Sequence, residues 1–484
     1  MSADPLQECH HHQHGAHAVS HLDQGSPRSL FTPRADTAAA AAVLTRDEAQ
    51  ALVERAVKLS TADAVRVTVQ SSRETNLRFA DNQISTSGAT TNTTVRVQSV
   101  FGKRKASVVT NDRSDEGLRR AVQQSEALAR LAPEDPEYLG ELPAQTYVGV
   151  DAWSERTASL SADDRARAAL TALAPARAGN ELTVAGYIVC SASATAIGTN
   201  AGAFAYHRGT TANYTLTART NDGTGSGWVG AEDTDWERID FRSVAERAID
   251  KARRSRNPVA LEPGRYTVIF EPEATANLVS LMANAFQARA ADEGRSAFSK
   301  PGGTKLGERI VDPRVTLYSD PADPLILASP FDGEGLPLSR QTWIKDGVLN
   351  QLAYNRYWAS RQNKAPTGGA AGLRMADGNE SLESLIASTT RGVLVTRLWY
   401  LRPLDQRTLM YTGLTRDGTF LIENGKILRS IKNFRFNDSP LFMLNNLEGV
   451  GRSVRTAGNE GGPGIAMPPI KVRDFNFTSL SDAV

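Results

Sequence analysis

Between residues 45 and 132 the spacing of hydrophobic positions changes from helical to strand-like and back to helical. Thr45 is a favourable helix N-cap, and apolar residues then recur every three or four positions up to Leu59. Apolar and polar residues alternate after that helix, which is typical of half-buried strands. We predict helices at 45–59 and 114–131, with strands at 65–70, 75–79, 93–100 and 106–110 between them.

The same order of elements recurs about 120 residues further along the chain. Asn82, which follows the first strands, corresponds to Asn200 in the second copy. A unit of one helix, four strands and one helix is therefore used twice, at 45–132 and 160–256, and predicts a pseudo-symmetric sheet. The elements of the second copy are a helix at 161–175, strands at 182–191, 195–198, 203–207 and 211–219, and a helix at 241–254.

Prolines at 258 and 263 mark a boundary, and the chain beyond them is rich in strands and turns. One helix is predicted at 275–289, with an apolar face that includes Leu281 and Ala285. Asn424-Gly425 supplies the positive φ of a type I′ hairpin turn. Strands are predicted at 266–270, 314–318, 335–344, 393–401, 409–414, 419–422 and 427–431.

The predicted fold class is α+β. A disordered head at 1–44 precedes an N-terminal α/β domain at 45–257, built from the duplicated unit, and a mostly β C-terminal domain at 258–484. The head has little periodicity and few bulky apolar residues, so a disordered extension that binds metal adventitiously is the favoured interpretation. A metal-delivery tail is the alternative, because the head contains Cys9, His10, His11, His12, His14, His17 and His21.

Composition excludes several classes of partner. Lys plus Arg number 55 and Asp plus Glu 54, so the net charge of +1 gives no overall attraction to nucleic acid or anionic lipid. No run approaches the ~18 apolar residues of a membrane-spanning helix. The two cysteines and the absence of a secretory signal predict a cytoplasmic protein with no direct nucleic-acid or membrane partner.

Candidate catalytic groups are few. His207 is the only histidine after the head, and no HExxH or G-x-S-x-G motif occurs, so His207 is interpreted as a structural strand residue. The letters GSGWVG at 225–230 match a dinucleotide motif, but an acidic stretch follows instead of a helix, which favours a β-turn.

Two carboxylate pairs could perform acid–base chemistry. Glu271 and Glu273 lie where a predicted strand meets a predicted helix, and Asp332 and Glu334 lie in a glycine-rich turn. Helix-capping and turn hydrogen bonds are the favoured roles for both pairs.

Several segments, taken together in order and spacing, resemble the TldD/PmbA family from about residue 45 to the end. They are RFADN at 78–82, SPFDGEG at 329–335, IKDGVL at 344–349, APTG at 365–368 and IENGK at 422–426.

The resemblance implies two kinds of subunit. TldD-type chains carry a zinc-binding HExxxH on the first helix of the second domain and a later ligand cysteine, whereas PmbA (TldE)-type chains lack these and pair with them. Laid on that motif, the first histidine falls on Ser280, the glutamate on Leu281, the second histidine on Ala285 and the cysteine near Asn459. The resemblance thus implies no cofactor in this chain and zinc in a TldD-like partner.

Three functional hypotheses follow. The favoured one is a non-catalytic TldE-like subunit that completes a TldD/TldE heterodimeric peptidase for unfolded or small peptides. The others are a stand-alone peptide-binding or regulatory protein of the DNA gyrase modulator type, and an independent hydrolase that uses carboxylates or the histidine-rich head. On the first hypothesis, the residues expected to face substrate are Asn277, Ser280, Asn284, Asp332 and Glu334.

Overall fold

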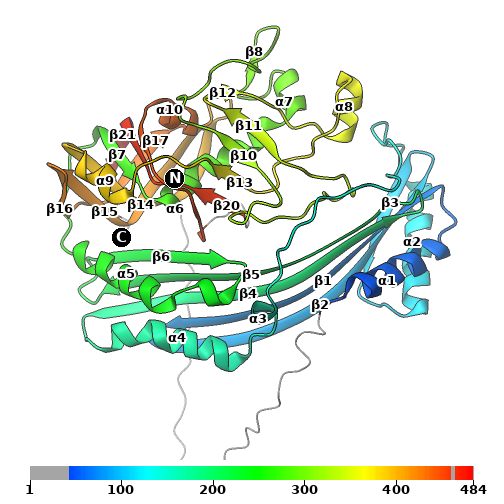
Figure 1. Cartoon of the computed structure of the whole chain (residues 1–484), viewed down its shortest axis with the longest axis horizontal. Helices are drawn as coiled ribbons and strands as arrows, with labels where there is room; N and C mark the ends of the chain where they lie inside the picture. Colours follow the sequence, from blue (N-terminus) through cyan, green and yellow to red (C-terminus); the bar gives the residue numbers. More distant parts are fainter. Residues whose placement is uncertain (1–42, 459–463, 483–484) are drawn as a thin grey trace, which may run out of the picture. The chain divides into compact units, whose positions relative to one another are not determined.

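The computed structural model describes residues 43–458 and 464–482 (Figure 1). It has the predicted α+β fold, with an α/β region followed by a strand-rich region. The histidine-rich head up to residue 42 and the position of Asn459 lie outside the described residues. The described chain starts at Val43, which is buried together with Leu44.

The N-terminal region contains one antiparallel six-stranded sheet in the order β3-β2-β1-β4-β5-β6. The first repeat supplies three neighbouring strands and the second repeat the other three, so β1 and β4 meet at the centre. The strands are β1 (Ala64–Ala80), β2 (Gln83–Phe101), β3 (Arg104–Thr110), β4 (Leu182–Thr199), β5 (Phe204–Thr220) and β6 (Ser226–Asp233).

Each repeat therefore has three strands instead of the predicted four. The strands predicted at 65–70 and 75–79 are one continuous strand of 17 residues, β1. Ser71 and Thr75 are buried on its inner face and interrupt the apolar pattern without interrupting the strand. The strand pairs predicted in the second repeat merge into β4 and β5 in the same way.

The two asparagines that mark the repeat occupy equivalent positions and make equivalent hydrogen bonds. Asn82 follows β1, and its side chain accepts from Val184 N–H (2.8 Å) and donates to the Leu182 carbonyl (2.9 Å) at the start of β4. Asn200 follows β4, and its side chain accepts from Val65 N–H (3.1 Å) and donates to the carbonyl of residue 63 (3.2 Å) before β1. Each central strand is thus fixed by the asparagine at the end of the other.

Helices cover the two ends of this sheet. Figure 1 shows α1 and α2 near one end of the sheet and α4 and α5 near the other; α1 packs on β1 and β4, α2 on β2 and β3, and α5 on β5 and β6. The N-cap predicted at Thr45 is confirmed, because Thr45 accepts a hydrogen bond from the third residue of its helix, and Ser114 and Ser161 cap their helices in the same way. The helices are α1 (Arg46–Leu59), α2 (Asp115–Leu131), α3 (Glu155–Ala158), α4 (Ala162–Arg177), α5 (Phe241–Arg254) and the 3₁₀ turn η2 (Trp236–Arg238).

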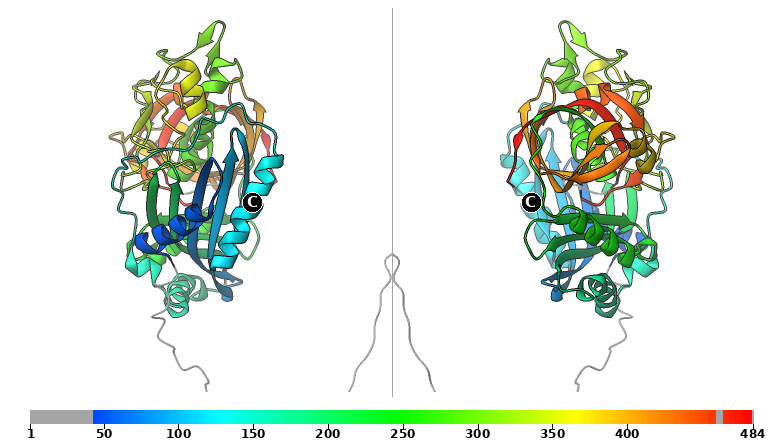
Figure 2. Two further views of the ribbon diagram at one scale, coloured as in Figure 1. Left: turned by 90° about the vertical axis from the view of Figure 1, so that its right-hand side faces the viewer. Right: turned by 90° about the vertical axis from the view of Figure 1, so that its left-hand side faces the viewer.

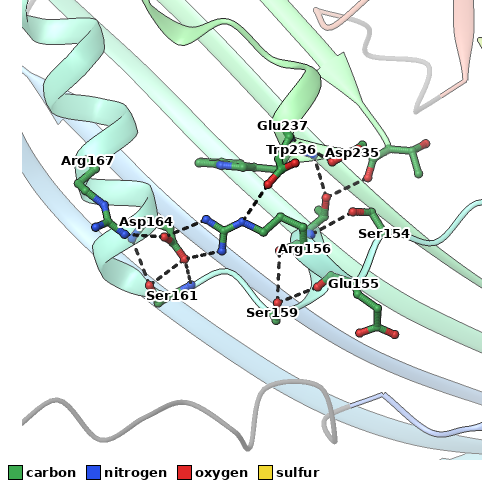
Figure 3. Close-up of polar contacts among 12 residues, drawn as sticks. Ser154, Glu155, Arg156, Ser159, Ser161, Asp164, Arg167, Asp235, Trp236 and Glu237 are labelled. Carbon is green, nitrogen blue, oxygen red and sulfur yellow. Dashed lines mark hydrogen bonds and ion pairs between the residues drawn. The ribbon is translucent and has the colours of Figure 1, made fainter.

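Asp164 at the start of α4 joins three local elements. It completes a capping box with Ser161, and its carboxylate accepts from Arg156 on α3 (3.1 and 3.2 Å) and from Arg167 (2.8 Å) (Figure 3). Arg156 also approaches Glu237 on η2, at 3.6 Å. Burial opposes ionisation of Asp164, but the hydrogen bonds from Ser161 and the arginines outweigh it and lower the pKa of the carboxyl.

The sequence interpretation of residues 225–230 as a β-turn is wrong for most of this glycine-rich stretch. A turn ends at Gly225, but residues 226–230 belong to the edge strand β6 and not to a β-turn. A Cβ on Gly225 or Gly227 would lie 2.3 Å from a backbone carbonyl oxygen of α5. These glycines therefore serve close packing of a helix on a strand and form no phosphate-binding loop.

The C-terminal region contains a ring of strands. β7 pairs with β14 and β21, β14 pairs with β15, and β17 joins β15 to β21, so the sheet closes on itself. The right-hand view of Figure 2 shows these strands curving around one another. The members of the ring are β7 (Gly264–Phe270), β14 (Arg391–Asp405), β15 (Met410–Glu423), β17 (Phe434–Asp438) and β21 (Ile470–Leu480).

A second six-stranded sheet, in the order β12-β11-β10-β13-β20-β19, packs in the same core. The hairpin turn predicted at Asn424-Gly425 is confirmed, since both residues have positive φ. The other strands are β8 (Ser299–Lys300), β9 (Gly303–Thr304), β10 (Leu317–Ser319), β11 (Gln341–Lys345), β12 (Val348–Leu349), β13 (Leu373–Met375), β16 (Lys426–Ser430), β18 (Leu447–Val450), β19 (Val454–Arg455) and β20 (Ile465–Met467). The helices are α6 (Pro272–Val279), the 3₁₀ helix η3 (Ser280–Phe286), α7 (Ala288–Asp292), α8 (Arg356–Gln362), α9 (Leu382–Ala387) and α10 (Pro440–Asn445).

Among the helices of the described residues, none combines the length and the apolar character needed to cross a membrane.

Candidate functional site

The segment predicted as one helix at 275–289 is divided into three parts. α6 begins at Pro272, whose ring fits the first helical position, and ends at Val279. It continues as the 3₁₀ helix η3, and α7 begins at Ala288 after an extended residue, Gln287. The predicted apolar face is buried all the same, because Leu278, Met282, Ala285 and Phe286 lie in the C-terminal core.

The three positions that the family resemblance aligns with zinc ligands carry no zinc-binding side chain. Ala285 is 8% exposed within the core, Leu281 packs against that core, and Ser280 is half-buried. Zinc sites in proteins use imidazole, thiolate or carboxylate ligands. These residues do not fit zinc, and the described residues include no cluster of three His, Cys, Asp or Glu side chains that could hold a metal ion.

The polar residues of this segment differ in burial and in their contacts. The Asn277 side-chain oxygen accepts a hydrogen bond from Leu398 N–H of β14 (3.0 Å), so this half-buried residue ties α6 to the ring. Asn284 is exposed on η3. Asn277 lies on α6 and Asn284 on η3, and contact of Asn277, Ser280 and Asn284 with substrate stays a prediction.

Glu273, in the first turn of α6, holds the segment that precedes residue 459. Its carboxylate accepts hydrogen bonds from the backbone N–H groups of Ala457 (2.6 Å) and Gly458 (3.1 Å). Burial raises the pKa of Glu273 to about 7, although these two hydrogen bonds favour the ionised form. Glu273 is thus a carboxyl group that changes charge near neutral pH.

Two further contacts hold the same segment from the N-terminal sheet. Arg455 pairs with Glu232 of β6 at 2.9 Å, and both side chains are less than 9% exposed. The side chain of Asn213 on β5 donates to the Ala457 carbonyl at 3.0 Å. Residues 455–458 are therefore fixed by side chains from β5, β6 and α6, just before the predicted position of the family's ligand cysteine.

A cleft of about 460 Å³ adjoins Glu273. One wall is charged and comes from α5, where Lys251 pairs with Glu271 at 2.7 Å. The lining also includes apolar side chains, among them Leu394 and Phe420. Such a cleft can accept a ligand with one charged and one apolar end, and the residues that line it include no histidine or cysteine to act as a nucleophile.

The second carboxylate pair makes the turn contacts that the sequence favours. The Asp332 carboxylate accepts from the N–H groups of Glu334 (2.9 Å) and Leu336 (3.0 Å). Gly335 has a φ of 84°, a conformation that favours glycine. Glu334 lies 3.9 Å from Arg356, and contact of either carboxylate with substrate stays a prediction.

His207 lies half-buried on β5, and burial lowers its pKa. Sequence reasoning found Glu273 but not its partners, because Glu232, Arg455 and Ala457 are far away in the chain. The only available signal was a carboxylate at a strand-to-helix junction.

Three family models match this chain. They are described as PmbA/TldA metallopeptidase domain 1 (residues 65–129), the central domain (155–256) and the C-terminal domain (263–479). Metalloprotease PmbA of Escherichia coli O157:H7 is 27% identical over 267 residues, which is 54% of each chain. The chain thus spans about half the length of that relative. A PmbA homologue of Haemophilus influenzae is 22% identical over 87% of this chain and 94% of its own.

Solved structures share the fold. TldE from Thermococcus kodakarensis superposes with a TM-score of 0.79 at 20% identity, covering 88% of this chain and 99% of its own. A candidate modulator of a DNA gyrase from Thermotoga maritima gives a TM-score of 0.79 at 18% identity, covering 89% of this chain and all of its own.

Proposed function

Given that the chain belongs to the PmbA/TldD metallopeptidase family, we propose that it is a non-catalytic, TldE-like subunit of a zinc peptidase. Its partner is a TldD-like chain that carries the zinc site, and the substrates of the pair are unfolded or small peptides. The observation that carries this proposal is the identity of Ser280, Leu281 and Ala285. A hydroxyl and two aliphatic side chains, one of them buried, cannot replace two histidines and a glutamate.

The segment at 455–458 supports the same proposal. Glu273, Glu232 and Asn213 hold this segment in place, and the described residues include no group of three His, Cys, Asp or Glu side chains that could bind a metal ion. A subunit of this kind can shape a substrate cavity and present its partner's zinc to the peptide.

The experiment compares three preparations: this full chain, a TldD-like chain and the two co-expressed. We expect cleavage of an unfolded peptide only by the pair, with one zinc per pair. The six head histidines are replaced by alanine in a parallel sample, so that metal bound by the head is not counted. A partner variant whose HExxxH glutamate is changed to glutamine should abolish cleavage without dissociating the pair.

Zinc-dependent cleavage by this chain alone would overturn the proposal and favour an independent hydrolase. Glu273→Gln would then identify the base, since Glu273 is the carboxyl whose pKa lies near neutrality. Stable peptide binding without cleavage in all three preparations would instead favour the stand-alone binding or regulatory protein.

A further inference from the structure

One stretch of the N-terminal sheet is exposed to solvent and lacks a neighbouring strand along one edge among the described residues. Residues 83–92 of β2 are exposed on both faces of the strand, with Gly88 half-buried. One edge of β2 pairs with β1 along its whole length. Its other edge pairs with β3 only from Val95 to Phe101, so within the part of the chain that the structure describes, the backbone of 83–92 has no strand on that side.

The hairpin between β2 and β3 shows which backbone groups face this free edge. Phe101 and Arg104 flank a two-residue turn, so they form a pair bonded by both of their backbone groups. Counting back from Phe101, the odd-numbered residues of β2 direct N–H and C=O towards the β3 side. Among the described residues, Ser87, Ala89 and Thr91 therefore present backbone groups that no strand pairs with, whereas Gly88 and Thr90 bond to β1.

The equivalent edge in the second repeat is closed. Residues 204–211 of β5 extend beyond β6, and the linker before α3 runs along them. Thr210 N–H donates to the Ala152 carbonyl at 2.8 Å, and isolated bridges join Ala152 to Gly209 and Pro143 to Gly202. The pseudo-symmetric fold thus covers this kind of edge with an extended segment in one repeat and leaves it open in the other.

The free edge also lacks the usual protection against pairing. Proteins guard exposed edges with lysine, proline or inward-pointing charges. Residues 83–95 read QISTSGATTNTTV and contain no charge and no proline, and the threonines favour extended backbone. The one irregularity is a bulge opposite Arg78 and Phe79, next to the hairpin turn.

We propose that residues 83–92 of β2 are a dimerisation edge, which pairs antiparallel with the same residues of a second copy of this chain. A two-fold axis needs a self-complementary strand, and an uncharged strand can lie beside its own copy without repulsion. The free stretch is bounded by the β1–β2 turn at one end and by the end of β3 at the other. In an antiparallel pair the turn of each copy comes to lie beside the end of the other copy's β3, so the two boundaries match. This proposal does not depend on the peptidase role.

The test is the association state of the full chain, measured by sedimentation velocity over a range of concentrations with a chelator present. We expect a reversible dimer. Thr91→Pro removes one outward N–H without removing a bond to β1, and Ala89→Lys places like charges together at the pairing. Each should raise the dimer dissociation constant at least tenfold, and the effect of the lysine should shrink at high salt.

Two matched controls separate pairing from misfolding. Ser107→Pro introduces proline at the outward edge in the middle of β3, away from the proposed interface, and Ala89→Gln lengthens residue 89 without charge. Both should leave the dimer intact. Amide exchange provides a second measurement: protection of Ser87, Ala89 and Thr91 should rise with protein concentration, while Gly88 and Thr90 stay protected throughout.

A monomer at every concentration would overturn the proposal. So would a dimer that Thr91→Pro and Ala89→Lys leave unchanged, because the contact would then lie elsewhere. Protection of Ser87, Ala89 and Thr91 that does not change with protein concentration would also overturn it.

Discussion

The N-terminal sheet and the C-terminal ring of strands differ in whether their edges are open. The C-terminal strands β7, β14, β15, β17 and β21 close into a ring, so each of them has a neighbour on both sides. The N-terminal sheet stays open and is organised by repetition, with one asparagine from each copy fixing the start of the other copy's central strand. The comparison indicates that the stability of the ring comes mainly from its apolar interior, whereas the stability of the open sheet comes from local polar contacts and covered edges.

The largest effect is expected from removing an aromatic side chain inside the ring. Phe475 is 1% exposed, and its ring centroid lies 4.9 Å from that of Phe270. Phe475→Ala should lower the free energy of unfolding by about 3–5 kcal/mol, measured by urea denaturation. Phe442→Ala, at a residue that is 45% exposed, is the control and should change it by less than about 1 kcal/mol. Equal losses in both variants would show that the ring interior is not the source of stability.

The next effect concerns Glu273, whose pKa is raised from 4.5 to about 7 by burial. The folded protein binds the proton of Glu273 more tightly than the unfolded chain does. The contribution of Glu273 to the free energy of unfolding is therefore fully present below pH 4.5 and is lost as pH rises through 7. The stability of the wild type relative to Glu273→Gln should therefore fall by about 3 kcal/mol between pH 4.5 and pH 8. Urea denaturation at several pH values measures this difference, and a difference that rises with pH would contradict the assignment.

Asp164 in the open-sheet region should respond to pH in the opposite direction. Its pKa is lowered by the hydrogen bonds from Ser161 and the arginines, so its contribution is present above its ordinary value of 3.8 and is lost as pH falls below it. Asp164→Asn should cost about 1–2 kcal/mol at pH 7, and this cost should shrink progressively as the pH is lowered below 3.8. Amide exchange of α4 localises the effect, and Asp163→Asn in the same turn is the control.

The smallest effect tests the equivalence of the two repeats. Asn82→Ala and Asn200→Ala each remove one accepted and one donated hydrogen bond to strand backbone. Each should lower the free energy of unfolding by about 1–2 kcal/mol, and the double variant should lose the sum. Melting curves followed by circular dichroism measure all three variants. A large loss in one variant and none in the other would show that the repeats are not energetically equivalent.

Local chemistry predicted much of the fold from the sequence. The cap at Thr45 and the turn at Asn424-Gly425 depend on residues within a few positions, and both predictions are confirmed. Strand lengths were underestimated because Ser71 and Thr75 are buried polar residues that look like a break in the pattern. The closure of the ring could not be predicted, because it depends on pairing between strands that are distant in the chain.

For the candidate site too, the sequence predicted local features but not contacts between distant parts of the chain. The sequence singled out Glu273, but its partners at Ala457 and Gly458 come from the far end of the chain. The predicted helix at 275–289 was wrong in its middle because the apolar spacing of Leu278, Met282, Ala285 and Phe286 suits a 3₁₀ segment as well as an α-helix. Burial of these residues followed from their hydrophobicity alone.

The ring has a consequence for synthesis of the chain. β7 is the first strand of the C-terminal region, and its antiparallel neighbour β21 is the last. The ring can therefore close only after almost the whole region has left the ribosome, whereas each N-terminal repeat is built from neighbouring strands and can form earlier. During translation the apolar surfaces of β7 and α6 stay uncovered until β21 has been made. We therefore expect the nascent C-terminal region to depend on chaperones more than the N-terminal repeats do.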